Sequence, residues 1–194
     1  MNLDDLTPMI ACPPDAEPLE FAVRTVEGLV HEDGWDGPNR VFFLEVTPSP
    51  LGSVPGTGAI AAREAPFGPD MGRMHPAQLL DLAAAATVLI GLPEPAFAVV
   101  AVFETWSVKK DPSASPAEKA KLDADRAAPR LDTRADRVEV RMAHLVTAGA
   151  EREIMLTRRR DEEPTVVPDA DGEQYSGIVP DALRRLAQVI GGGR

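Results

Sequence analysis

Four side chains that could carry out acid–base or metal chemistry lie within the six-residue segment His31-Glu32-Asp33-Gly34-Trp35-Asp36. An imidazole beside carboxylates can exchange protons with a substrate or ligate a metal ion. The other two histidines, His75 and His144, lie far along the chain, and no spacing requires them to meet His31, so we predict no metal site. The competing interpretation is a solvated helix end, with Trp35 folded back as an apolar anchor and His31 near the negative end of the helix dipole.

Glu104 is the other candidate for chemistry, because it shares one face of an otherwise apolar run, residues 97 to 108, with Trp106. A buried carboxyl there would have a raised pKa and could act as a general base. It could equally be a structural carboxylate, paired with Arg40 or Arg141, or an exposed one near a sheet edge. The candidate catalytic residues are therefore Glu104, Asp36 and His31.

Two further motifs predict no chemistry. Residues 56 to 61, Gly-Thr-Gly-Ala-Ile-Ala, match the letters of a dinucleotide-binding turn, but three of the eight preceding residues are proline and remove the strand that such a turn follows. We therefore predict a loop there and no cofactor. Arg158-Arg159-Arg160 is followed at once by Asp161-Glu162-Glu163, which indicates a charged sheet edge and not a nucleic-acid contact.

The acidic charge of the chain lies in its first half. The net charge is -11, and residues 1 to 96 hold 14 acids against 4 Arg, whereas residues 97 to 194 hold 17 acids against 16 Lys and Arg. Such a field repels nucleic acid and anionic membranes and attracts a basic partner. We therefore expect a protein partner, with nucleic-acid and membrane binding disfavoured.

The cysteine content and the apolar runs predict a cytoplasmic protein. Cys12 is the single cysteine, so no internal disulfide can form. The first residues lack the pattern of a secretory signal, and the run from Leu79 to Leu92 is too short for a membrane span.

The elements that must position these residues follow from hydrophobic periodicity and breakers. Leu19, Val23, Val26 and Val30 form one apolar stripe of a predicted helix that Gly34 ends. Further helices are predicted at 76–90, 116–128 and 180–190, and strands at 41–46, 97–108, 136–147 and 151–158.

The remaining segments predict one domain with long loops. We expect an irregular arm over residues 1–15, a single α+β domain over 16–190 with loops at 47–75 and 109–135, and a loose tail over 191–194. The predicted architecture has two layers. It consists of a mainly antiparallel sheet of about four strands, three packed helices and one exposed helix.

Three stretches carry a family resemblance: Gly34-Trp35-Asp36-Gly37-Pro38-Asn39-Arg40-Val41-Phe42, Phe103-Glu104-Thr105-Trp106-Ser107-Val108 and Leu156-Thr157-Arg158-Arg159-Arg160. They are similar to segments of small uncharacterised proteins from high-GC Gram-positive bacteria or their phages. The resemblance implies a bacterial or phage origin, and it carries over no activity, cofactor or partner.

Two hypotheses of function follow from the sequence. The first is a non-catalytic binding or accessory protein that presents its acidic half and the 47–75 loop to a protein partner, and it is compatible with a homo-oligomer. The candidate binding residues are Trp35, Arg40, Phe67 and Trp106. The alternative is a small hydrolase or transferase with a carboxylate and histidine site, which requires Glu104, Asp36 and His31 around one concave pocket.

Overall fold

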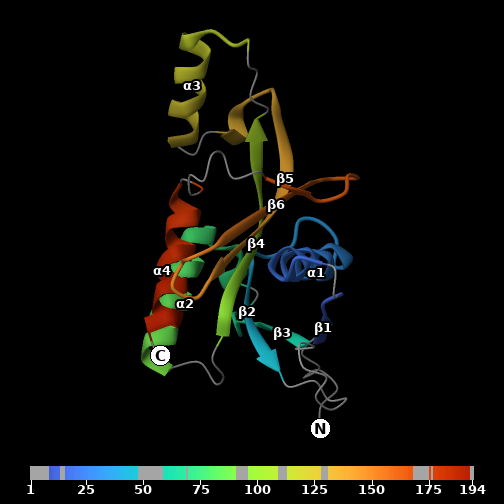
Figure 1. Ribbon diagram of the computed structural model, residues 1–194. Helices are drawn as coiled ribbons and strands as arrows, with labels where there is room; N and C mark the ends of the chain where they lie inside the picture. The colour runs from blue at the N-terminus through green and yellow to red at the C-terminus, as the bar shows by residue number, and fades with distance from the viewer. Residues whose placement is uncertain are drawn as a thin grey trace.

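An antiparallel sheet forms the centre of the protein (Figure 1). The computed structural model describes residues 9–13, 16–47, 59–68, 70–90, 96–108, 113–127, 131–167, 175 and 177–192. In these residues the strands are β1 (Met9–Ala11), β2 (Arg40–Thr47), β3 (Ala59–Glu64), β4 (Ala96–Val108), β5 (Arg137–Thr147), β6 (Glu153–Arg159) and β7 (Thr165–Val166). They lie side by side in the order β1-β3-β2-β4-β5-β6-β7.

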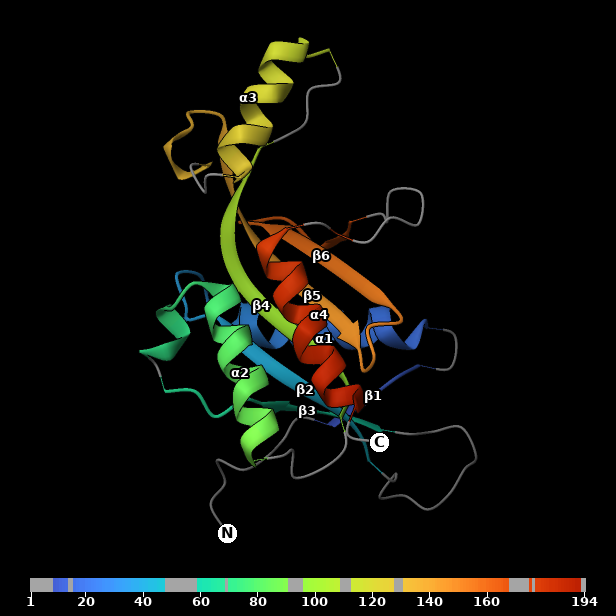
Figure 2. The ribbon, with the colours of Figure 1, turned by 90° about the vertical axis from the view of Figure 1, so that its left-hand side faces the viewer.

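Helices cover both faces of this sheet, so the described part of the chain has three layers. The helices are α1 (Pro18–Glu32), α2 (Pro76–Ile90), α3 (Pro116–Ala127) and α4 (Ile178–Gly192). Figure 2 shows α2 and α4 side by side in front of the sheet, with α1 behind it. The predicted α+β class and antiparallel sheet are confirmed, and the expectation of two layers is wrong.

The third layer has a clear physical cause in β4. Its residues Ala98, Val100 and Val102 pack on the α1 side, and the residues between and after them pack on the side of α2 and α4. Both sets are buried, so each face of the strand needs a covering helix. The continuous apolar run of β4 is the sequence signal of this arrangement.

The α1 helix begins and ends as its sequence predicts. The Glu17 carboxylate caps it by accepting a hydrogen bond from the Glu20 N–H at 2.7 Å. The predicted apolar stripe is buried. Gly34, with a φ of 92°, lies just beyond the end, where a residue with a side chain would be strained. This turn sends the chain back toward the sheet and brings residues 33–38 to the site described below.

Short elements appear where the sequence predicts irregular chain. β1 lies in the expected arm, and β3 together with a 3₁₀ turn, η2 (Met71–Arg73), lies in the expected 47–75 loop. β7 adds a two-residue edge, and α4 extends to Gly192 in the expected tail. The motif residues 56–58 lie outside the described residues. Strands this short have too few residues to show a hydrophobic period, and their pairing partners define them.

The segment between β4 and β5 holds the exposed helix. Figure 1 shows α3 at the far end of β4 and β5, away from α1 and α2. The predicted capping box is present, since the Ser115 N–H donates to the Glu118 carboxylate at 2.8 Å and the Glu118 N–H donates to the Ser115 hydroxyl at 3.3 Å. A second 3₁₀ turn, η3 (Leu131–Thr133), leads back into β5. No helix within the described ranges is long and apolar enough to cross a membrane.

Candidate functional site

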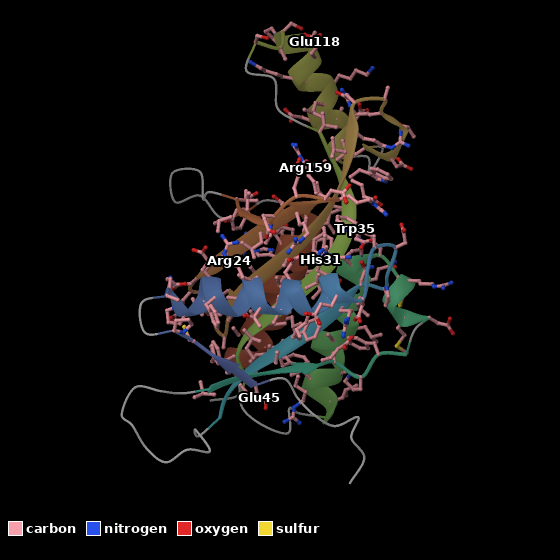
Figure 3. The ribbon with its side chains drawn as sticks, turned by 90° about the vertical axis from the view of Figure 1, so that its right-hand side faces the viewer. Arg24, His31, Trp35, Glu45, Glu118 and Arg159 are labelled. Carbon is pink, nitrogen blue, oxygen red and sulfur yellow. The ribbon has the colours of Figure 1, made fainter. Side chains whose placement is uncertain are left out.

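A row of charged side chains crosses three strands beneath the end of α1. The strand register places Glu104 of β4 opposite Arg141 of β5, and Arg141 opposite Arg158 of β6. Directly paired residues point to the same face, which here is the face that α1 covers. Figure 3 shows His31 and Trp35 at the end of α1, and His31 Nδ1 lies 3.4 Å from Arg141 in this row.

Arg141 is the centre of the site, and its side chain is only 1% exposed. One nitrogen donates to the Glu104 carboxylate at 2.8 Å and also to the Gly34 carbonyl. Another lies 3.4 Å from His31 Nδ1. Because a guanidinium only donates, Nδ1 must accept, so neutral His31 carries its proton on Nε2. Within the described residues Arg141 Nε has no partner.

Glu27 and Arg158 form a buried ion pair on this face. Nε and one terminal nitrogen of Arg158 donate to the two carboxylate oxygens of Glu27 at 2.8 and 2.7 Å, and Arg141 lies 3.8 Å from the same carboxylate. Sequence reasoning missed this pair. The available signal was that Glu27 falls within the apolar stripe of α1, between Val23 and Val30 at helical spacing.

The turn after α1 is fastened to the sheet through Trp35 and Asp36. The guanidinium carbons of Arg141 and Arg160 lie 4.6 and 4.9 Å from the Trp35 ring centroid, so the ring is held by cations and not in an apolar pocket. The Asp36 N–H donates to Glu104 at 2.8 Å. Asp36 has a φ of 67°, which an Asp adopts more readily than most residues.

Three carboxylates meet beside this turn. Oxygens of Asp36, Glu104 and Glu139 lie within 4.8 Å of one another, a spacing that could hold a cation. Arg160 already bonds Glu139 at 2.8 Å and lies 3.4 Å from Asp36. The bond to Glu139 is the main cause that raises the pKa of Arg160. The chain thus supplies its own cations to this cluster.

A cavity of about 220 Å³ opens on the other side of Arg141, and we call it the acidic hollow. Its lining residues are Val30, Asp33, Gly34, Gly37, Pro38, Arg40, Glu64, Val102, Phe103, Glu104 and Arg141. Arg40 donates to Asp33 at 2.6 Å and to Glu64 at 2.8 Å. The hydrogen bond to Glu64 is the main cause that raises the pKa of Arg40. The hollow combines apolar walls with a charged rim.

The segment after β3 is attached to the hollow's rim. The Asn39 N–H donates to the Gly72 carbonyl at 2.7 Å, and the Asn39 side chain donates to the Met74 carbonyl at 2.8 Å. A Cβ on Gly72 would lie 2.5 Å from Pro38 Cβ, so glycine is needed for this close approach. The exposed Asp33 and Glu64 meet at Arg40 on this rim, although they are distant in the sequence.

The structure divides the three candidate catalytic residues. Glu104 lines the acidic hollow, whereas His31 lines a second, more open cavity of about 430 Å³ with Trp35 and Arg158. Asp36 lines neither. The three residues meet through Arg141 and the Asp36 N–H, and not around one concave pocket.

The candidate binding residues are also separated. Arg40 lines the acidic hollow and Trp35 lines the second cavity. Phe67 is partly buried against the core of α2 and α4. Trp106 is half-buried, opposite Glu139 and 4.7 Å from the Arg137 guanidinium.

His144 lies on the opposite face of the sheet, in a network that sequence reasoning did not find. It is fully buried, and its Nε2 lies 3.1 Å from the Glu153 carboxylate, which also bonds Arg184 of α4. The Tyr175 ring stands edge-on, 5.3 Å from the imidazole. Burial lowers the pKa of His144, although Glu153 opposes this shift. Burial would raise the pKa of Glu153, but bonds from His144 and Arg184 lower it overall.

Comparison with known proteins assigns no family. No family model matches this chain, and no curated protein or solved structure matches it.

Proposed function

We propose that this chain is a non-catalytic binding protein whose acidic hollow receives a lysine or arginine side chain of a protein partner. The observation that carries the proposal is the composition of the hollow. Among the described residues its lining has three carboxylates, two guanidiniums and several apolar side chains. This combination suits a side chain with an aliphatic stem and a cationic end.

The size of the hollow supports a single side chain as its occupant. A volume of about 220 Å³ is below the range of roughly 300 to 1,000 Å³ that holds drug-sized ligands. The stem would pack on Val30, Pro38 and Phe103. The cation would meet Asp33 and Glu64, whose side chains are 70% and 43% exposed and so reachable by a partner.

The charge of the molecule supports the same occupant. Both accessible carboxylates belong to the first 96 residues, which hold nearly all of the net charge of -11. An acidic field raises the association rate of a basic partner, and this effect weakens with salt. Residues 70–75, attached to the rim through Gly72, supply further contact surface for the partner.

The state of the candidate catalytic groups supports a non-catalytic role. One Glu104 oxygen accepts from Arg141, and the other accepts from the Asp36 N–H. A general base must reach a substrate proton, and here both oxygens are already engaged in fastening the turn.

The experiment is an NMR titration of the ¹⁵N-labelled full chain with two short peptides, one with a central arginine and one with citrulline at that position. Citrulline keeps the shape of arginine without its charge. We expect the arginine peptide to shift the amide signals of residues 33–37, 39, 40 and 64, with the citrulline peptide bound at least about tenfold more weakly. Equal binding of both peptides, or shifts elsewhere, would overturn the proposal.

One observation favours the alternative, a small hydrolase or transferase. His31 and Glu104 both contact Arg141, at 3.4 and 2.8 Å, so an imidazole and a carboxylate share one guanidinium. The test is turnover of chromogenic esters and phosphates by the wild type and by Glu104→Gln. Turnover that the substitution abolishes would support the enzyme, and turnover equal to that of buffer would count against it.

The proposal also places the protein in the cytoplasm. The single cysteine, Cys12, is free, and a fold held by burial alone suits a reducing compartment.

A further inference from the structure

The outer face of α2 exposes apolar side chains to solvent. Leu82, Val88 and Leu89 are 37%, 69% and 84% exposed, and Ala85 between them is also exposed. Leu82, Ala85 and Leu89 recur at spacings of three and four, so they share one side of the helix. We call these four residues the α2 stripe. An apolar patch of this kind is typical of an interaction surface.

The α2 stripe carries no charge. Residues 82–90 read Leu-Ala-Ala-Ala-Ala-Thr-Val-Leu-Ile, and the carboxylate just before them, Asp81, is paired with Arg185 of α4 at 2.8 Å. In a chain with a net charge of -11 this is an unusual surface. A basic partner would find no free carboxylate within the stripe to select it, so electrostatic recognition belongs to the acidic hollow and not to this face.

We infer that the α2 stripe binds the α2 stripe of a second copy of this chain. The stripe is self-complementary, because a two-fold axis beside Ala85 places Leu89 of one copy against Leu82 of the other. The small Ala85 side chains allow the antiparallel helices to approach to about 8 Å. A charge-free patch is also where two molecules of like charge can meet with the least repulsion.

The area of the stripe sets the strength of this dimer. α2 has 15 residues and is therefore about 22 Å long, and one helix with the exposed side of α4 beside it offers less than the roughly 800 Å² per partner of a standard interface. The dimer is therefore reversible, with a dissociation constant in the micromolar range. Salt screens the repulsion between the two acidic copies, so added salt strengthens the dimer.

The test is sedimentation equilibrium of the full chain from low micromolar to submillimolar concentration, for the wild type, Leu89→Glu and Val46→Glu. Val46 is a matched control, since it is 66% exposed and lies on the α1 side of the sheet. We expect a monomer–dimer equilibrium in the wild type that tightens with salt. Leu89→Glu should raise the dissociation constant about a hundredfold or more, and Val46→Glu should leave it unchanged.

Other occupants of the stripe give other outcomes, and each overturns the inference. A monomeric wild type whose thermal stability falls in Leu89→Glu would show that another segment of this chain covers the stripe. A monomeric wild type, together with a Leu89→Glu variant of unchanged thermal stability, would show that the stripe does not bind a second copy. A dimer that Val46→Glu weakens as much as Leu89→Glu would place the interface elsewhere.

Discussion

Glu27 has no exposed surface, and its carboxylate accepts two hydrogen bonds from Arg158, while Arg141 lies 3.8 Å away. We predict that Arg158→Met lowers the free energy of unfolding by about 3 kcal/mol, because the Glu27 carboxylate loses both of its hydrogen bonds from Arg158 and keeps only the more distant Arg141 as a cation. Urea denaturation measures this change.

The double variant Glu27→Leu/Arg158→Met is the control for this pair. Removing both charges together leaves apolar groups of similar size, so its free energy of unfolding should lie well above that of Arg158→Met. If the double variant is the less stable of the two, the pair is not the structural contact that its geometry indicates.

His144 makes the stability depend on pH. Burial lowers its folded pKa, so below the unfolded value of about 6.5 the unfolded chain binds a proton that the folded chain does not. Stability should therefore fall as the pH decreases from about 7 to 5. The lowered pKa of Glu153 adds a further loss at more acidic pH, as the pH falls from its unfolded value through its folded pKa.

The variant His144→Gln isolates this effect, since glutamine can still donate to Glu153 but does not titrate. Thermal denaturation at several pH values should give a flatter profile for His144→Gln than for the wild type, with His75→Gln as the matched control. A profile as steep as that of the wild type would contradict a titrating role for His144.

At this scale the sequence predicts which residues can do chemistry, but not what holds them. Arg141 was one of two predicted partners of Glu104. The sequence could not choose between them, because Glu104 and Arg141 meet only if β4 and β5 pair in the register that places them opposite each other. The contacts of Arg141 with Gly34 and His31 depend on where α1 ends over the sheet, which no local pattern encodes. The buried network of His144 likewise depends on Arg184 of α4, 40 residues away along the chain.

At the scale of the elements, α4 packs closely on the turn between β5 and β6. A Cβ added to Gly191 would lie 2.5 Å from the Gly149 nitrogen, and that nitrogen donates to the Ala187 carbonyl at 3.0 Å. Gly191→Ala must therefore move the helix end off the turn, and it should lower the free energy of unfolding by about 1 to 3 kcal/mol. Guanidinium denaturation measures this loss.

Gly192 provides the matched control for this contact. A Cβ there meets nothing within 4 Å, and alanine favours a helix more than glycine does. Gly192→Ala should therefore be neutral or stabilising by up to about 1 kcal/mol. If Gly191→Ala and Gly192→Ala lower the free energy of unfolding equally, the loss does not come from the contact between Gly191 and Gly149.

The long elements could be predicted and the short ones could not. Helices α1 and α2 and strands β4 and β5 each show several repeats of their period, and their positions agree with the sequence expectations to within a few residues. β3 was missed because Ala59-Ile60-Ala61-Ala62 has too little amphipathic contrast to indicate a strand. It is defined by its pairing with β2 and β1, which is information from the tertiary structure.

For the whole molecule, the net charge of -11 alone does not locate a binding surface, because the fold determines where the carboxylates gather. The fold brings Asp33 and Glu64, which are 31 positions apart in the chain, to the same guanidinium at the rim of the hollow. It also leaves the α2 stripe uncharged on the other side of the sheet. The two surfaces should therefore respond to salt in opposite ways. Added salt should weaken binding of a basic partner to the acidic hollow and strengthen pairing of two copies through the α2 stripe.

The most direct test of a basic side chain in the acidic hollow is calorimetric titration of the arginine peptide into Asp33→Asn/Glu64→Gln and into Glu151→Gln/Glu163→Gln. Both variants remove two exposed carboxylates, so the net charge changes equally. We predict that the first variant binds the peptide at least about tenfold more weakly than the wild type, and that the second retains nearly the wild-type affinity. Equal affinity in the two variants would contradict the account.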